Sequence, residues 1–164
     1  MTTELGELRF NRLLVAVDGS ANSELALSAA VTAARRDNSA LTLVSVAPDA
    51  AERALWPGAL AVPQPAQSEL DAAAEATLRE ALARIPVDIT VERIVRRGAA
   101  GPQIVAQSKA GCYDAILLGA RGLGRISGLV GSVSQYVLKH ADIAVFVAHA
   151  PRETPAPPGG AAAR

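Results

Sequence analysis

The sequence predicts an α/β protein of three layers, in which helices cover both faces of an open, twisted parallel sheet. Apolar stretches of strand length alternate with helical stretches along most of the chain. Strands that are joined by helical crossovers run parallel and are buried on both faces. Half of the 164 residues are hydrophobic but only 3% are aromatic. We therefore expect one domain, residues 1–150, with a core of small aliphatic side chains.

Five segments are expected to be strands. Residues 13–17, 41–46 and 115–118 are short apolar runs, which are typical of strands buried on both faces. Residues 143–148 form a similar run near the end of the chain. Around residues 89–94, Ile89 and Val91 alternate with polar neighbours. A half-polar strand of this kind belongs nearer an edge of the sheet.

Helices are expected between these strands. The first runs to about Arg36, with Ser20 or Asn22 as its cap. The second has apolar residues at helical spacing over 68–85, and Pro86 stops it. Two shorter helices are expected at 101–109 and 133–140. Residues 48–67 lack either periodicity and predict a long surface loop, and the proline-rich residues 151–164 predict a disordered tail.

Composition excludes several classes of function. Sixteen basic residues balance sixteen acidic ones, so no overall field favours a nucleic acid or an anionic membrane. No apolar run approaches the roughly 20 residues that a membrane span needs, and the N-terminus lacks the apolar region of a secretory signal. The single cysteine, Cys112, fits a reducing compartment. We expect a cytoplasmic protein.

The richest motif is the run Gly-Ala-Arg-Gly-Leu-Gly-Arg-Ile-Ser-Gly-Leu-Val-Gly-Ser-Val-Ser at residues 119–134. It joins an expected strand to an expected helix. Glycines let backbone amides approach an anion closely, and a helix start adds free N–H donors and a positive dipole end. Asp18 follows the first strand. If the first and fourth strands are neighbours, both features open into one crevice at the carboxyl ends of the strands.

Simpler interpretations of these residues remain open. The glycine run is also compatible with a flexible turn before a capped helix, and Asp18 with a residue that only orders its turn. No Gly-Lys-Ser/Thr motif, dinucleotide fingerprint or nucleophile elbow is present. We therefore predict no catalytic residues. His140 and His149 lack a matching set of acids or cysteines, so we predict no metal site either.

The chain resembles the universal stress protein family over about residues 12–149, in segments 13–20, 41–46, 114–122, 131–134 and 137–141. The resemblance implies a Rossmann-like sheet in the order 3-2-1-4-5, which places the first and fourth strands side by side. It also implies a homodimer, commonly paired through the last strand, which here begins at Ile143 and ends at Ala148.

One branch of that family binds ATP through a Gly-x2-Gly-x9-Gly-Ser/Thr pattern. This chain has Gly119 and Gly122, but only eight residues separate Gly122 from Gly131 and Ser132. The resemblance implies contacts of Asp18 with ribose or adenine, and of Val46 with adenine through its main chain. The positions that match the nucleotide site are Ala16, Val17, Asp18, Val46, Leu118, Gly119, Gly122, Gly131, Ser132, Val133 and Ser134.

These observations predict a regulatory stress-response module that binds ATP, with or without Mg²⁺, and hydrolyses it slowly at most. No placed general base or arginine finger stands out in the sequence. Two alternatives stay open: a nucleotide-free dimeric interaction protein of the same fold, and an enzyme acting on a nucleotide α-phosphate. The enzyme would need histidine- or lysine-rich motifs near the phosphates, which the chain lacks. The sequence leaves the choice of adenine nucleotide and the protein partner open.

Overall fold

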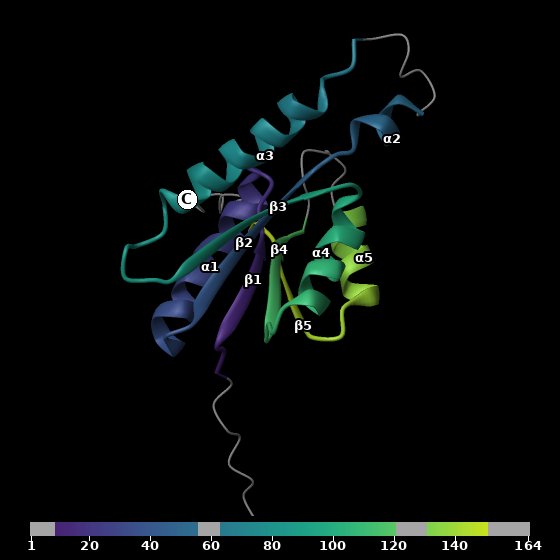
Figure 1. Ribbon diagram of the computed structural model, residues 1–164. Coiled ribbons are helices and arrows are strands. Elements are labelled where there is room, and N and C mark those ends of the chain that lie inside the picture. Colours follow the sequence, from purple (N-terminus) through teal and green to yellow (C-terminus); the bar gives the residue numbers. More distant parts are fainter. Residues whose placement is uncertain (1–8, 56–62, 121–130, 151–164) are drawn as a thin grey trace, which may run out of the picture.

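A computed structural model describes residues 9–55, 63–120 and 131–150 (Figure 1). Within these ranges the strands form one parallel sheet in the order β3-β2-β1-β4-β5, as expected. The expected C-terminal tail, residues 151–164, lies outside the described residues. The strands are β1 (Arg12–Ala16), β2 (Ala40–Ala47), β3 (Val91–Arg97), β4 (Ala115–Gly119) and β5 (Ala144–Ala148).

Helices lie on both faces of this sheet. In Figure 1, α1 and α3 lie on one side of the strands and α4 and α5 on the other. The two faces have separate cores: Val15 packs with the α1 and α3 side, and its neighbour Leu14 with the α4 and α5 side. The helices are α1 (Ala21–Asp37), α2 (Ala50–Ala54), α3 (Gln67–Leu82), α4 (Ala100–Ala110) and α5 (Ser132–His140).

Helix α1 begins and ends with local signals. Ser20 is its N-cap, and its hydroxyl accepts a hydrogen bond of 3.2 Å from the amide of Ser23. The structure thus selects Ser20 over Asn22 as the cap. At the other end, Asn38 takes a left-handed conformation with φ of 58°, which asparagine tolerates better than most residues.

The segment 48–67 was predicted to be a loop throughout, and this was wrong at α2. Asp49 caps this five-residue helix, because its carboxylate accepts from the amides of Ala51 and Glu52. The side chain of Gln67, at the start of α3, also accepts a 2.8 Å hydrogen bond from the amide of Ala50. A helix this short shows no periodicity in the sequence, so only its cap could have revealed it.

The end of α3 also differs from the prediction. The helix stops at Leu82, and the amides of Arg84 and Ile85 then bond to the carbonyls of Ala81 and Leu82. These tighter bonds continue the chain to Ile85, which is buried in the core. The apolar spacing therefore predicted the burial of Ile85 correctly but placed the helix end three residues too late.

The two edges of the sheet differ in character. β3 is an edge strand, as its half-polar pattern predicted, and carries Glu92 and three arginines. β5 forms the other edge with the uncharged sequence Ala-Val-Phe-Val-Ala, and Phe146 is 43% exposed. None of the helices in the described ranges has both the length and the apolar character to span a bilayer.

Candidate functional site

The first and fourth strands are direct neighbours in the sheet. Leu13, Leu14 and Val15 of β1 pair in parallel with Ala115, Ile116 and Leu117 of β4. The carboxyl ends of both strands therefore meet at the same end of the sheet, where Asp18 follows β1 and Ala120 follows β4. This carboxyl-end edge is distinct from the edge strands β3 and β5. The Asp18 turn and the start of the glycine-rich segment, which the sequence predicts on the two sides of one crevice, are therefore next to each other.

The turn from β1 into α1 is fixed by its own hydrogen bonds. One carboxylate oxygen of Asp18 accepts from the amide of Ser20 at 2.9 Å, and Gly19 has a φ of +77°. The hydroxyl of Ser23 accepts from the amide of Asp18 at 3.4 Å and donates to the carbonyl of Ser20 at 2.9 Å. Asp18 orders the turn, yet it remains exposed, and its second oxygen has no partner in the described part of the chain.

The tip of β4 lies against the first turn of α1. A Cβ atom on Gly119 would come within 2.7 Å of the carbonyl carbon of Asn22 and the amide nitrogen of Ser23. A side chain at this position would overlap the helix backbone. Gly119 therefore brings the start of α1, and with it the Asp18 turn, against the tip of β4.

The glycine-rich segment leaves and rejoins the fold at one place. The amide of Ala120 donates to the carbonyl of Ala148 at 2.7 Å, and the amide of Gly131 donates to the carbonyl of Ala120 at 2.6 Å. Residues 121–130 between them, including Gly122, lie outside the described residues. The two ends of the segment are thus fixed beside the tips of β4 and β5.

The start of α5 lies beside the tip of β4 and carries two serines in different environments. Ser132 is exposed, whereas Ser134 is 1% exposed and its hydroxyl lies 3.0 and 3.1 Å from the carbonyls of Gly119 and Ala120, to which it donates. Gly131 is the N-cap, and no side chain caps the helix among the described residues. The first amides of α5 remain available to a ligand.

Strand alternation divides the remaining site residues between the two faces. Ala16, Val46 and Leu118 belong to the apolar cluster under α4 and α5. Val17 belongs to the cluster under α1 and α3, so its side chain points away from the other three. The main chain of Val17 lies in the plane of the sheet, and its amide donates to the carbonyl of Val44 at 2.9 Å. Val17 can therefore reach the side of Ala16, Val46 and Leu118 through its main chain and not through its side chain.

Sequence reasoning missed a polar clasp at the same edge of the sheet. Asp71 of α3 accepts hydrogen bonds from Arg97 at the end of β3 and from Gln67, whose amide also donates to the carbonyl of Pro48. The hydrogen bonds from Arg97 and then Gln67 lower the pKa of Asp71, and the same ion pair raises the pKa of Arg97. The clasp joins the ends of β2 and β3 to α3.

A second missed contact lies nearer the glycine-rich segment. The side-chain oxygen of Asn22 accepts a 3.2 Å hydrogen bond from the amide of Ala150. This bond ties the chain beyond β5 to the first turn of α1. Neither contact had a signal in the sequence, because Arg97 is distant from Asp71 along the chain, as Ala150 is from Asn22, and neither pair belongs to a motif.

The chemistry of this edge suits recognition of a polar ligand. An exposed carboxylate can accept from hydroxyls, and the amides of a helix start can donate to an anion. In the described ranges no group of three His, Cys, Asp or Glu side chains is placed to hold a metal ion. Donors and acceptors for a ligand thus gather at the carboxyl ends of the strands.

Comparison with known families decides the relationship. Residues 9–149 match the model of the Universal stress protein family, which is most of the chain. The chain belongs to the universal stress protein family. It is 36% identical over 141 residues to the universal stress protein Rv2623 of Mycobacterium tuberculosis. That match covers 83% of this universal stress protein but 44% of its relative, so the chain spans less than half the relative's length.

Solved structures of other universal stress proteins share the fold. UspA from Lactobacillus plantarum is 29% identical, with a TM-score of 0.69, and 87% of this chain covers 100% of that one. A universal stress protein in complex with cAMP is 23% identical over 87% of this chain and 99% of that one, with a TM-score of 0.66. One from Archaeoglobus fulgidus in complex with dAMP is 21% identical over 87% and 100%, with the same TM-score.

Proposed function

We propose that this universal stress protein binds an adenine nucleotide, ATP, at the carboxyl ends of β1, β2 and β4. The observation that carries the proposal is the convergence at one edge of the Asp18 carboxylate, the two fixed ends of the glycine-rich segment and the uncapped start of α5. The complexes of two similarly folded universal stress proteins with cAMP and dAMP support the ligand class.

The base and ribose are assigned to the β1 and β2 side of this edge. Ala16 and Val46 are half-buried and lie on the same face as Leu118, so together they offer an aliphatic surface to adenine. The main chain of Val46 at the strand end would meet the polar edge of the base. The free oxygen of Asp18 would accept a hydrogen bond from a ribose hydroxyl.

The phosphates are assigned to the start of α5. The amides of Ser132 and Val133 and the exposed hydroxyl of Ser132 would donate to phosphate oxygens, and the helix dipole favours their charge. Gly119 and Gly122 would border the ribose and phosphates, and Gly131 would begin the phosphate cradle. Mg²⁺ would be held through the phosphates. For Ser134 we propose a positioning role, since its hydroxyl already holds the tip of β4.

We assign the protein a regulatory role in the cytoplasm. Nucleotide binding would order the glycine-rich segment and change a surface that a protein partner recognises. Hydrolysis would be slow at most, because no general base or arginine finger stands out in the sequence. The nucleotide acts in this proposal as a signal whose presence is sensed.

We also propose a homodimer paired through β5. An uncharged, partly exposed edge strand presents backbone groups that readily pair with another strand. β5 fits this description, whereas the opposite edge, β3, carries Glu92 and arginines, which discourage edge pairing. The contrast between the two edges supports β5 as the strand that pairs.

Isothermal titration with ATP and Mg²⁺ tests the nucleotide proposal. Asp18→Ala should weaken binding about tenfold or more, the scale of a hydrogen bond to a charged group. Asp88→Ala is the matched control, because it removes an exposed acid that precedes β3 at the opposite end of the strands. The absence of saturable heat in the unmodified protein would contradict the proposal.

A nucleotide-free interaction protein is the second candidate, and one observation favours it. The spacing from Gly122 to Gly131 is one residue shorter than the pattern of the ATP-binding branch. Mass spectrometry of nucleotides released from the purified protein separates the two candidates. ATP binding that appears only after one glycine is inserted between residues 122 and 131 would favour the second.

A further inference from the structure

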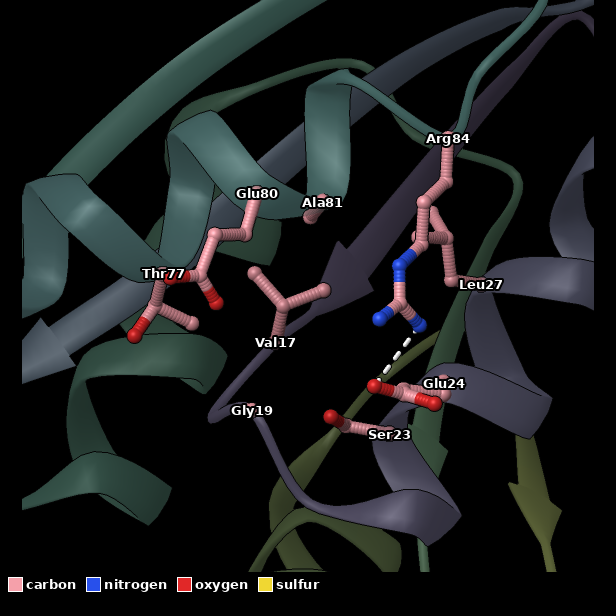
Figure 2. Close-up of a pocket in the computed structure, with 9 residues that line it drawn as sticks. All are labelled: Val17, Gly19, Ser23, Glu24, Leu27, Thr77, Glu80, Ala81 and Arg84. Carbon is pink, nitrogen blue, oxygen red and sulfur yellow. Dashed lines mark ion pairs between the residues drawn. The ribbon is translucent and has the colours of Figure 1, made fainter.

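A small pocket lies between α1 and α3, on the face of the sheet opposite α4 and α5 (Figure 2). It contains about 310 Å³ of space, which includes solvent at its mouth. This is room for a small molecule. The side chain of Val17 lines this pocket, whereas Ala16, Val46 and Leu118, to which the base is assigned, lie on the other face. The pocket is therefore distinct from the surface assigned to the base.

The inner wall of the pocket is apolar. Val17 and Leu27 are each 5% exposed and Ala81 is 9% exposed, and all three belong to one hydrophobic cluster. Figure 2 shows Val17 rising into the space between the two helices. A ligand of this pocket therefore needs a short apolar part.

The polar groups around the pocket differ in their remaining hydrogen-bonding capacity. The hydroxyl of Ser23 donates to the carbonyl of Ser20, and that of Thr77 donates to the carbonyl of Ala73. Arg84 pairs with Glu24 at 2.7 Å across one side of the pocket (Figure 2). One nitrogen of the Arg84 guanidinium is thus engaged by Glu24, and both hydroxyl hydrogens are used.

Glu80 also lines the pocket, and its carboxylate can accept hydrogen bonds. Its carboxylate makes no ion pair or hydrogen bond with any residue in the described ranges. In Figure 2 the carboxylate lies next to Thr77, away from the Arg84–Glu24 pair. Two carboxylates and one guanidinium surround the pocket, so its formal charge is negative and it favours a cation.

We propose that this pocket binds a small aliphatic amine, with the alkyl stem against Val17, Leu27 and Ala81 and the ammonium group at Glu80. An ammonium group has three donors and no acceptor, so it matches the carboxylate of Glu80. An anion would meet the net negative charge of two carboxylates and one guanidinium, which disfavours it. The alkyl part removes apolar surface from water, and the carboxylate supplies the charge partner.

The pocket also touches the turn that carries Asp18. Val17 and Gly19 line it on either side of Asp18, and the methyl group of Thr77 lies 4.0 Å from the Cβ position of Gly19. An amine in the pocket would therefore alter the affinity of the nucleotide, and the nucleotide would alter that of the amine by the same factor. This coupling rests on the proposed nucleotide site, whereas amine binding does not.

A titration by two-dimensional NMR without nucleotide tests the amine site. Butylamine at neutral pH should shift the amide signals of Val17, Gly19 and Thr77 with saturation, and butan-1-ol, which lacks the charge, should not. Glu80→Gln should weaken binding about three- to fivefold, the scale of an exposed ion pair. Glu75→Gln on the same helix, outside the pocket, should leave it unchanged.

Three results would overturn the assignment: shifts that do not saturate, equal shifts with butan-1-ol, or equal affinities of the Glu80→Gln and Glu75→Gln proteins. Nα-acetyl-lysine amide, which carries the same alkylammonium group on a peptide unit, distinguishes a free amine from a lysine side chain. Tighter binding of butylamine supports the free amine, and tighter binding of the lysine derivative contradicts it. Nucleotide titrations with and without butylamine then test the coupling separately.

Discussion

Gly119 has a steric role that does not depend on any ligand. Its missing side chain lets the backbone of Asn22 and Ser23 approach the tip of β4. The sequence predicted this glycine as part of a ligand-binding run, because runs of glycine point to close backbone approach. It did not predict which backbone approaches, since α1 is about a hundred residues away along the chain.

Replacing Gly119 with alanine should therefore destabilise the fold itself. A Cβ atom 2.7 Å from two backbone atoms forces α1 or β4 to move, and overpacking of this kind costs about 1–3 kcal/mol. Thermal unfolding without nucleotide measures the effect as a fall in Tm of about 2–4 °C per kcal/mol. An unchanged Tm would show that the strand tip relaxes freely.

Ser132 and Ser134 form a matched pair with opposite expected effects. Ser134→Ala removes a buried hydroxyl that donates to the carbonyls of Gly119 and Ala120, and loss of this hydrogen bond costs about 0.5–1.5 kcal/mol in the free energy of unfolding. Ser132→Ala removes an exposed hydroxyl and should lower nucleotide affinity while changing stability little. Urea unfolding and calorimetric titration of both variants check the prediction, and a reversal of the two effects would contradict it.

At the scale of elements, continuous apolar runs predicted the buried strands well. β1, β2 and β4 lie at the centre of the sheet, where both faces are covered, and their sequences lack polar alternation for that reason. The missed element, α2, depends on Asp49 and on Gln67 from another helix. Its stability comes from these contacts and not from a hydrophobic face, which is the signal that sequence periodicity detects.

The contrast between the sheet edges leads to a prediction for β5. Ala144→Lys places a charge on an exposed position of the edge strand, which should disfavour strand pairing between two copies. Light scattering coupled to size-exclusion chromatography should show a dimer for the unmodified protein and a monomer for this variant. Arg93→Glu on the other edge, β3, is the control and should leave the dimer intact. A dimer in both variants would place the interface elsewhere.

At the scale of the whole molecule, the alternation of strands and helices predicted both the class and the layers. The strand order followed from the family resemblance, because periodicity alone does not say which strands are neighbours. The pocket between α1 and α3 was beyond sequence reasoning for the same reason. Its two walls, around Ser23 and Thr77, come from helices that only the packed fold brings together.

Acid stability should depend in part on the Asp71 clasp. Hydrogen bonds from Arg97 and Gln67 lower the pKa of Asp71 in the folded protein. A lowered folded-state pKa contributes stability above the unfolded carboxyl pKa of about 3.9, and this contribution is lost as the pH falls through the folded value. Asp71→Asn should therefore be less stable than the unmodified protein at pH 7 and differ less from it near pH 3. Urea unfolding at both pH values measures this, and a constant difference would contradict it.

The amide of Gly131 donates to the carbonyl of Ala120, so the two residues that flank the intervening ten are held together. Because Ala120 is also bonded to Ala148, a change in the number of residues between Ala120 and Gly131 need not strain a strand. Adding one residue to a segment of this length alters the free-energy cost of joining its two ends by well under about 1 kcal/mol. At the proposed nucleotide site, ligand preference could therefore be changed by insertion or deletion without altering the strands that carry it.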